Sequence, residues 1–62
     1  MSQNGEIRFK DADRVLRRNG FVWDRSRGSH HYYTRDGKGI VINIRTNRMV
    51  WRRLCKEHGL VE

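Results

Sequence analysis

The sequence predicts an α+β fold in which a helix, three antiparallel strands and a second helix follow one another along the chain. Three observations predict it: apolar residues recur at helical spacing before Gly20, β-branched and aromatic segments fill the middle of the chain, and helical spacing returns before Gly59. Each predicted helix has one apolar side, so we expect both helices on the same face of the three-stranded sheet. A chain of 62 residues has room for one domain.

The first helix is predicted over residues 9–19. Its apolar side consists of Phe9, Ala12, Val15 and Leu16. Gly20 ends the helix, because glycine readily adopts the positive φ that is common at a helix C-terminus. Residues 6–9 are compatible with an extended segment or with the start of the helix. We therefore divide the chain into a flexible N-terminal segment, residues 1–8, and a single domain, residues 9–62.

Three strands are predicted, over residues 21–26, 30–35 and 40–45. The dipeptide Asp36-Gly37 between the second and third strands is a strong signal for a β-hairpin turn. Strand side chains alternate between two faces, so one face of the first strand should carry Phe21, Trp23 and Arg25. The same rule groups three residues of the third strand: Ile40, Ile42 and Ile44.

The second helix is predicted to begin after Thr46 or Asn47, because either side chain can accept a hydrogen bond as the N-cap. Its apolar or semi-apolar side consists of Met49, Val50, Trp51, Leu54, Cys55 and His58. Gly59 ends the helix, and Leu60 should fold back onto its last turn.

The charge of the chain narrows the choice of partners. Lysine and arginine number 14 against 7 acidic residues, and the formal net charge is +7. Most of these cations are arginines, which bind phosphate through two hydrogen bonds and stack on bases. The balance indicates a nucleic acid, an anionic membrane or an acidic protein as partner, with a merely solvated surface as the alternative.

The cysteine and acidic residues limit the chemistry of a site. Cys55 is the one cysteine, which excludes an internal disulfide and fits a reducing cytoplasm. Cys55 and His58 lack the further ligands of a zinc site, and Asp24 and Asp36 form no metal-binding group. No segment is long and apolar enough to span a membrane. We therefore expect a cytoplasmic protein without a metal or a cofactor.

The segment Gly28-Ser29-His30-His31-Tyr32-Tyr33 is the strongest candidate for chemistry. Histidine exchanges protons near neutral pH, and the arginines around this segment create a cationic field that attracts phosphate. The combination favours acid–base chemistry on a nucleic acid, although paired histidines in a basic protein can also be solvated polar residues. Adjacent strand residues point to opposite faces, so at most one of the two histidines acts at a given site.

Further candidates for binding are aromatic or basic. Tyr32 can stack on a base. A basic cluster lies at the end of the third strand and in the last helix: Arg45, Arg48, Arg52 and Arg53. The cluster can follow a nucleic-acid backbone, meet an acidic partner or be a solvated face. Trp51 and Tyr32 are candidate apolar anchors for such a partner, with a place in the core as the alternative.

Residues 10–60 resemble the HicA toxin family of bacterial toxin–antitoxin systems. The resemblance is carried by Arg17-Arg18-Asn19-Gly20-Phe21 after a helix, by the Gly28–Tyr33 segment, by Asp36-Gly37, and by the closing Leu54-Cys55-Lys56-Glu57-His58-Gly59-Leu60. It implies a fold like that of double-stranded-RNA-binding domains, with the order helix, three strands, helix. It also implies a metal-independent and ribosome-independent endoribonuclease that cleaves mRNA, and a HicB-type antitoxin that blocks its site.

The resemblance places the catalytic histidine directly after Gly-Ser, which here is His30. The candidate RNA-binding residues are Arg25, Arg27, Gly28, Ser29, Tyr32 and Arg35. The candidate antitoxin-binding residues are Arg45, Arg48, Trp51, Arg52 and Arg53. Two other functions stay open: a double-stranded-RNA-binding module without catalysis, and a DNA-binding regulator, which the lack of a helix-turn-helix pattern disfavours.

Overall fold

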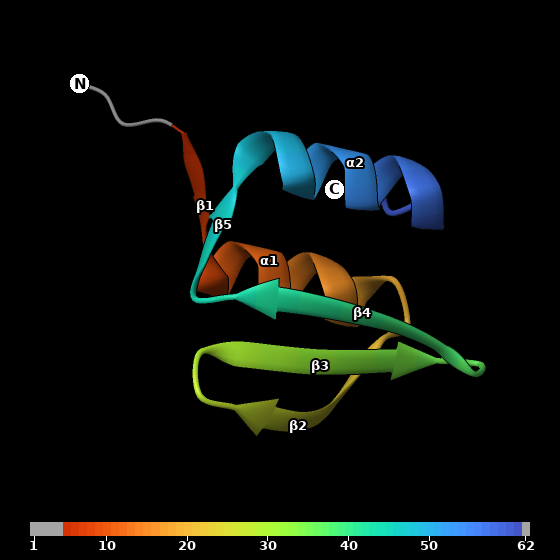
Figure 1. Ribbon diagram of the computed structural model, residues 1–62. Helices are drawn as coiled ribbons and strands as arrows, with labels where there is room; N and C mark the ends of the chain where they lie inside the picture. The colour runs from red at the N-terminus through yellow and green to blue at the C-terminus, as the bar shows by residue number, and fades with distance from the viewer. Residues whose placement is uncertain (1–4, 62) are drawn as a thin grey trace.

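The predicted order of helix, three strands and helix is confirmed by a computed structural model, which describes residues 5–61. In chain order the elements are β1 (Glu6–Arg8), α1 (Phe9–Arg18), β2 (Val22–Arg27), β3 (His30–Arg35), β4 (Lys38–Asn43), β5 (Arg45–Asn47) and α2 (Arg48–His58) (Figure 1). The main sheet has the strand order β2-β3-β4 with antiparallel neighbours. This is the α+β arrangement that the family resemblance implies.

A two-residue turn sets the register between β3 and β4. Asp36 and Gly37 both have positive φ, at 49° and 82°, and Arg35 pairs directly with Lys38 across the turn. Two central residues of positive φ twist the chain in the direction that two neighbouring strands require. The turn predicted from the Asp-Gly dipeptide is thus confirmed, and it fixes which residues of β3 and β4 lie opposite each other.

The core lies between the helices and one face of the main sheet. In Figure 1, α1 runs behind β4, and α2 lies beyond α1 on the same side. The buried hydrophobic residues are Ala12, Leu16, Phe21, Tyr33, Ile40, Ile42, Trp51 and Leu60. They come from both helices, from β3 and β4, and from the segments before β2 and after α2. So small a core leaves the opposite face of the main sheet exposed.

A β-bulge in β2 interrupts the alternation of side chains that was expected along the first strand. The register shifts between Trp23, which pairs with Tyr33, and Arg25, which pairs with Tyr32. Asp24 is the extra residue, so Trp23 and Arg25 point to opposite faces instead of sharing one. Phe21 precedes β2 and is buried in the core.

Two further expectations about apolar residues are wrong. β4 ends at Asn43, and Ile44 lies in a bend between β4 and β5 with 53% of its surface exposed. Met49 and Val50 were expected on the buried side of the last helix, but they are 79% and 46% exposed. α2 is instead rotated about its axis so that Trp51 is buried and Leu54 and Cys55 pack against the core.

A second, two-stranded sheet pairs β1 with β5 in antiparallel fashion. Ile7 and Thr46 lie opposite each other in it; Thr46 is buried, and Ile7 packs against the core. Strands of three residues are too short to show an alternating pattern, so the sequence does not predict this pair. Residues 1–4 of the expected flexible segment lie outside the described residues, whereas Glu6–Arg8 is a strand.

Both ends of α2 follow the predicted capping. The side-chain oxygen of Asn47 accepts a hydrogen bond from the backbone N–H of Met49 at 2.7 Å. Gly59 adopts a φ of 64°, and the N–H of Leu60 donates to the carbonyl of Cys55 at 2.8 Å. This bond turns the chain back so that Leu60 enters the core.

Asn19 joins the end of α1 to the end of the described chain. Its side-chain amide donates to the carbonyls of Val15 at 2.7 Å and of Val61 at 3.0 Å. Its side-chain oxygen accepts from the N–H of Val61 at 3.0 Å. One side chain therefore satisfies both backbone groups of Val61 and one carbonyl of the last turn of α1.

Replacement of this amide tests its role in stability. We expect Asn19→Ala to lower the free energy of unfolding by about 1–2 kcal/mol, because it removes the three side-chain hydrogen bonds that join the last turn of α1 to Val61. Urea denaturation followed by circular dichroism measures the change. The neighbouring Arg18→Ala, at an exposed position, should change stability by no more than about 0.5 kcal/mol. Equal stability of the two variants would show that Asn19 is dispensable.

Stability at alkaline pH should depend on Tyr33. Its hydroxyl donates to a carboxylate oxygen of Asp13, and burial together with this carboxylate raises the pKa of Tyr33 well above its usual value of 10.0. A group whose pKa is raised on folding contributes stability that is complete below the unfolded pKa and is lost as pH rises through the folded one. We therefore expect stability to fall above about pH 10. Tyr33→Phe should weaken this pH dependence, whereas Tyr32→Phe should retain it; thermal melts from pH 7 to 11 compare them.

Candidate functional site

The face of the main sheet that points away from the helices carries rows of residues placed side by side by the strand register. The row next to the Gly28–Ser29 turn contains Arg27, His30 and Asn43. The next row contains Arg25, Tyr32 and Val41, and the last contains Val22, Thr34 and Gly39. We call these nine residues the open sheet face, because directly paired residues of antiparallel strands project to the same side.

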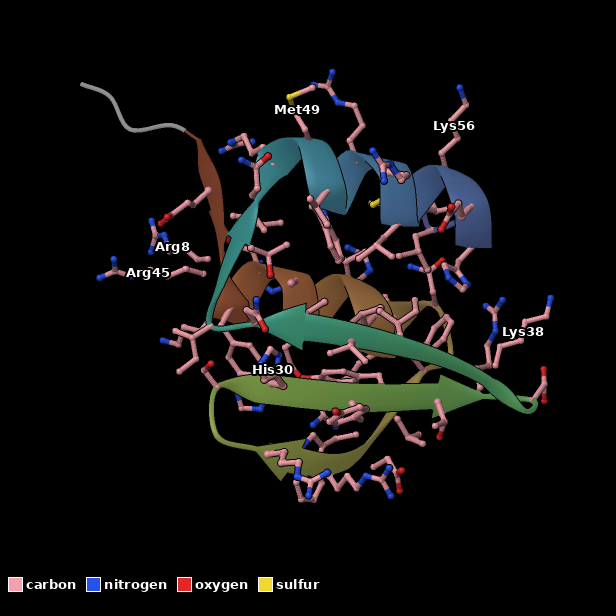
Figure 2. All side chains as sticks on the ribbon, in the orientation of Figure 1. Arg8, His30, Lys38, Arg45, Met49 and Lys56 are labelled. Atoms are coloured by element: carbon pink, nitrogen blue, oxygen red, sulfur yellow. The ribbon has the colours of Figure 1, made fainter. Side chains whose placement is uncertain are left out.

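His30 is the first residue of β3 and lies at the centre of its row. Gly28 has a φ of 61° and allows the tight turn from which β3 begins. The side chain of His30 is exposed, and no hydrogen bond to its ring is found within residues 5–61. Both imidazole nitrogens can therefore reach a bound molecule, with Arg27 on one side and Asn43 on the other. Figure 2 shows His30 at the end of β3 nearest this turn.

Tyr32 and Arg25 form the second row of the same face. The guanidinium carbon of Arg25 lies 5.1 Å from the centre of the Tyr32 ring. In this cation–π contact a positive charge lies over the aromatic ring. Such a pair can stack on a nucleobase and attract a phosphate at the same time. The structure thus brings together four residues predicted for the site: Arg25, Arg27, His30 and Tyr32.

His31 points to the opposite face, as the alternation predicted. Its Nδ1 atom lies 2.7 Å from the hydroxyl of Ser26, which also accepts a hydrogen bond from the indole of Trp23 at 3.0 Å. Its ring lies 4.4 Å from the ring of Phe9, centre to centre, at the start of α1. These contacts give His31 a structural environment that differs sharply from that of His30.

Arg35 also points toward the helices. Its guanidinium donates to the carbonyl of Asn19 at 2.7 Å and lies 4.6 Å from the centre of the Phe21 ring. Arg35 was grouped with the candidate RNA-binding residues because it is near them in sequence. The structure instead places it away from the open sheet face, in contact with the loop between α1 and β2.

Polar contacts hold the corner between β4 and β5 beside His30. The hydroxyl of Thr46 accepts from the N–H of Asn43 at 3.1 Å and donates to the carbonyl of Asn43 at 3.0 Å. The N–H of Ile44 donates to the carbonyl of Ser29 at 3.2 Å. A shallow hollow at this corner is lined by Ser29, Asn43, Ile44 and Arg45. Ser29 therefore borders the site through its exposed hydroxyl and anchors the corner through its backbone.

Asn43 is a site residue that the sequence analysis missed. The signal for it was present: counting outward from the Asp36-Gly37 turn, with Arg35 opposite Lys38, places Asn43 opposite His30. The register of a hairpin follows from the length of its loop. An amide at this position can donate hydrogen bonds to a phosphate or accept them from a sugar hydroxyl.

The candidate antitoxin-binding residues are brought together only in part: Arg48, Trp51 and Arg52 line one hollow on α2, and Arg45 lies apart from it. Arg52 and Arg53 are exposed on α2, next to Met49, whose side chain projects away from the body of the protein (Figure 2). Arg45 lies in β5 at the corner near His30. Trp51 is 4% exposed and belongs to the core, so its place as an anchor for a partner is corrected. Its apolar surface is already buried within this chain.

Two further features of the described part of the chain concern metals and membranes. Within residues 5–61, no three histidine, cysteine or acidic side chains are grouped so that they could hold a metal ion. Neither of the described helices is long and apolar enough to cross a membrane.

Comparison with known proteins relates this geometry to a family. A family model described as "HicA toxin of bacterial toxin-antitoxin" matches residues 9–59. Neither the search of curated proteins nor the search of solved structures gives a match. The matched region covers more than half of the 62 residues and includes both helices, the main sheet and His30. This chain therefore belongs to the HicA family of toxins from bacterial toxin–antitoxin systems.

Proposed function

We propose that this chain is a cytoplasmic endoribonuclease that cleaves mRNA as the toxin of its toxin–antitoxin pair, with His30 as the catalytic residue. The observation that supports the proposal is the exposed imidazole of His30, free of intramolecular hydrogen bonds within residues 5–61, with Arg27 beside it. A proton-transfer group next to a phosphate-binding group is the pair that RNA cleavage requires.

The chemistry needs little from the protein because RNA carries its own nucleophile. The 2′-hydroxyl attacks the neighbouring phosphorus, and a nitrogen of His30 accepts its proton. The bond to the 5′-oxygen of the next nucleotide breaks, and that oxygen leaves with a proton from the imidazolium or from water. The products are a 2′,3′-cyclic phosphate and a 5′-hydroxyl. General base catalysis of this kind contributes about 10²–10⁴-fold to the rate.

The residues around His30 position the RNA in this proposal. Arg27 and Arg25 hold phosphates and stabilise the charge that develops on the phosphorane oxygens. The Tyr32 ring and the Arg25 guanidinium over it stack on a base as a pair. The side-chain amide of Asn43 and the hydroxyl of Ser29 donate further hydrogen bonds to the RNA, on the side of His30 away from Arg27. An exposed sheet face suits a single strand, whose unpaired bases are free to stack.

The antitoxin in this proposal is of the HicB type and covers the basic outer side of α2. The outer side of α2 combines the positive charges of Arg52 and Arg53 with the exposed apolar side chains of Met49 and Val50. Such a surface fits an acidic partner that also supplies an apolar contact. Charge complementarity speeds the encounter, and buried apolar contacts lengthen the lifetime of the complex.

Substitution of His30 tests the catalytic role. We expect His30→Ala to lower the rate of RNA cleavage by at least about 100-fold, since it removes the general base. It should retain the fold, because the side chain is exposed. Induced expression should no longer arrest growth, and cleavage by the purified wild-type protein should persist in EDTA. Circular dichroism and RNA cleavage assays measure these effects.

His31→Ala is the matched control for this experiment. Its loss removes the contacts with Ser26 and Phe9, so it should lower stability while retaining more cleavage activity than His30→Ala below the melting temperature. A folded His30→Ala protein that still cleaves RNA at the wild-type rate would refute the assignment. RNA binding without cleavage by the wild-type protein would favour the alternative, a non-catalytic double-stranded-RNA-binding module.

Reversal of charge on α2 tests the antitoxin surface. We expect Arg52→Glu with Arg53→Glu to slow association with the antitoxin by about tenfold or more at low salt, because electrostatic steering is reversed. Co-expression of the antitoxin should also no longer protect cells from the toxicity of this double variant. Surface plasmon resonance against the purified antitoxin measures both rate constants. Unchanged association and dissociation rates would show that the outer side of α2 is not the docking surface.

A further inference from the structure

Two arginines outside the open sheet face lie side by side in the small sheet. Arg8 of β1 and Arg45 of β5 are direct cross-strand partners. Their side chains extend in the same direction, away from the body of the protein (Figure 2). Like charges placed directly opposite each other on antiparallel strands destabilise the pair. Within the described part of the chain, neither guanidinium forms an ion pair with a carboxylate.

This pair of arginines lines a hollow in the surface. Its charged lining consists of Arg8, Lys10, Arg45 and one acidic residue, Glu6. Three cations and one anion give the lining a net positive charge. Ile7, Phe9 and Ile44 complete the lining with apolar atoms. A hollow lined by cations and apolar atoms fits a sugar–phosphate unit, because arginine binds phosphate through two hydrogen bonds while the sugar carbons contact the apolar atoms.

This hollow adjoins a second one that is lined by neighbours of the proposed catalytic residue. Ile44 and Arg45 line both this hollow and the one that contains Ser29 and Asn43. The N–H of Ile44 is bonded to the carbonyl of Ser29, the residue before His30, and Asn43 lies opposite His30. Paired and bonded neighbours therefore connect His30 across the β4–β5 corner to Arg45 and Arg8.

We infer that Arg8 and Arg45, with Lys10, form a second phosphate-binding site that holds the RNA backbone next to the phosphodiester at His30. The inference rests on the proposed ribonuclease function. Arg8 lies outside residues 9–59, which the family model matches, whereas Lys10 and Arg45 lie within them, so the matched region does not contain the whole site. The connection to His30 favours RNA as the occupant over an acidic protein.

Salt dependence of binding tests the site apart from catalysis. The probe is a short mixed-sequence single-stranded RNA, and the background is His30→Ala, so that the RNA stays intact. We expect Arg8→Gln with Arg45→Gln to weaken binding roughly tenfold at low salt and to reduce the slope of log K against log salt by about 1.4, since each phosphate contact contributes about 0.7. Fluorescence anisotropy at several salt concentrations measures both.

Lys38→Gln with Lys56→Gln is the matched control. It removes the same net charge from exposed positions at the β3–β4 turn and on α2, away from this site (Figure 2). We expect it to change the slope by much less than the arginine pair. Equal effects of the two double variants would show a diffuse electrostatic field instead of a site and would overturn the inference.

Thermal stability separates binding from a structural role. Because Arg8 and Arg45 are like charges in direct register, loss of either one should leave the melting temperature unchanged or raise it. Retained stability together with weaker RNA binding supports the inference. A melting temperature that falls in step with RNA affinity overturns it, because the arginines would then be needed for the small sheet itself.

A chemically modified RNA locates the contact. Replacing one phosphodiester beside the scissile position by an uncharged methylphosphonate should weaken binding to the His30→Ala protein. The same replacement should have little further effect when Arg8→Gln and Arg45→Gln are also present, because the contact is already lost. Equal losses in both backgrounds at every flanking position would overturn the inference.

The remaining outcomes separate this inference from the proposed function. Wild-type protein that cleaves RNA, with unchanged binding after the arginine substitutions, overturns the inference alone. Substitutions that abolish antitoxin binding and leave RNA affinity intact also overturn it, in favour of a protein interface. Wild-type protein that neither binds nor cleaves RNA overturns the proposed function and the inference together.

Discussion

The alternation of side chains along β3 is the constraint on which the rest of the structure depends. His31, Tyr33 and Arg35 face the helices, and each contacts α1 or the loop that follows it. His30 and Tyr32 face the open side of the sheet. A slip of one residue in the register would exchange the two sets and destroy the core and the proposed site together. One strand therefore ties the folding of the core to the presentation of His30.

Short turns on both sides of β3 maintain that register. Asp36-Gly37 sets Asn43 opposite His30, and Gly28-Ser29 sets Arg27 opposite it. The bulge at Asp24 lies beyond this region, so Arg25 and Arg27 stay on the open face while Trp23 is directed to the other. The proposed site is thus built at the end of the sheet where both turns and the β4–β5 corner meet, and backbone pairing specifies its geometry.

Arginines that look alike in the sequence have different surroundings in the fold. Arg17 forms an ion pair with Asp13 at 3.0 Å, and Arg35 is bonded to the backbone of Asn19. Arg25 covers the ring of Tyr32, whereas Arg8 and Arg45 oppose each other without an ion pair in the described chain. The high net charge predicts a polyanionic partner, but only the positions of individual side chains indicate where phosphates would lie.

The sequence by itself determined the elements whose signals are local: the helical spacing of Leu16 and its neighbours, the Asp36-Gly37 turn, the Gly59 cap, and the opposite facing of His30 and His31. It limited the N-cap of the last helix to Thr46 or Asn47, and the structure shows Asn47. The tertiary structure decided what depends on distant pairing. It placed Arg35 with the core, buried Trp51, exposed Met49 and formed the β1–β5 sheet that brings Arg8 to Arg45. The physical reason is that caps, turns and periodicity act over a few residues. Burial and cross-strand contacts depend on segments far apart in the chain, whose arrangement is set by packing around the shared core.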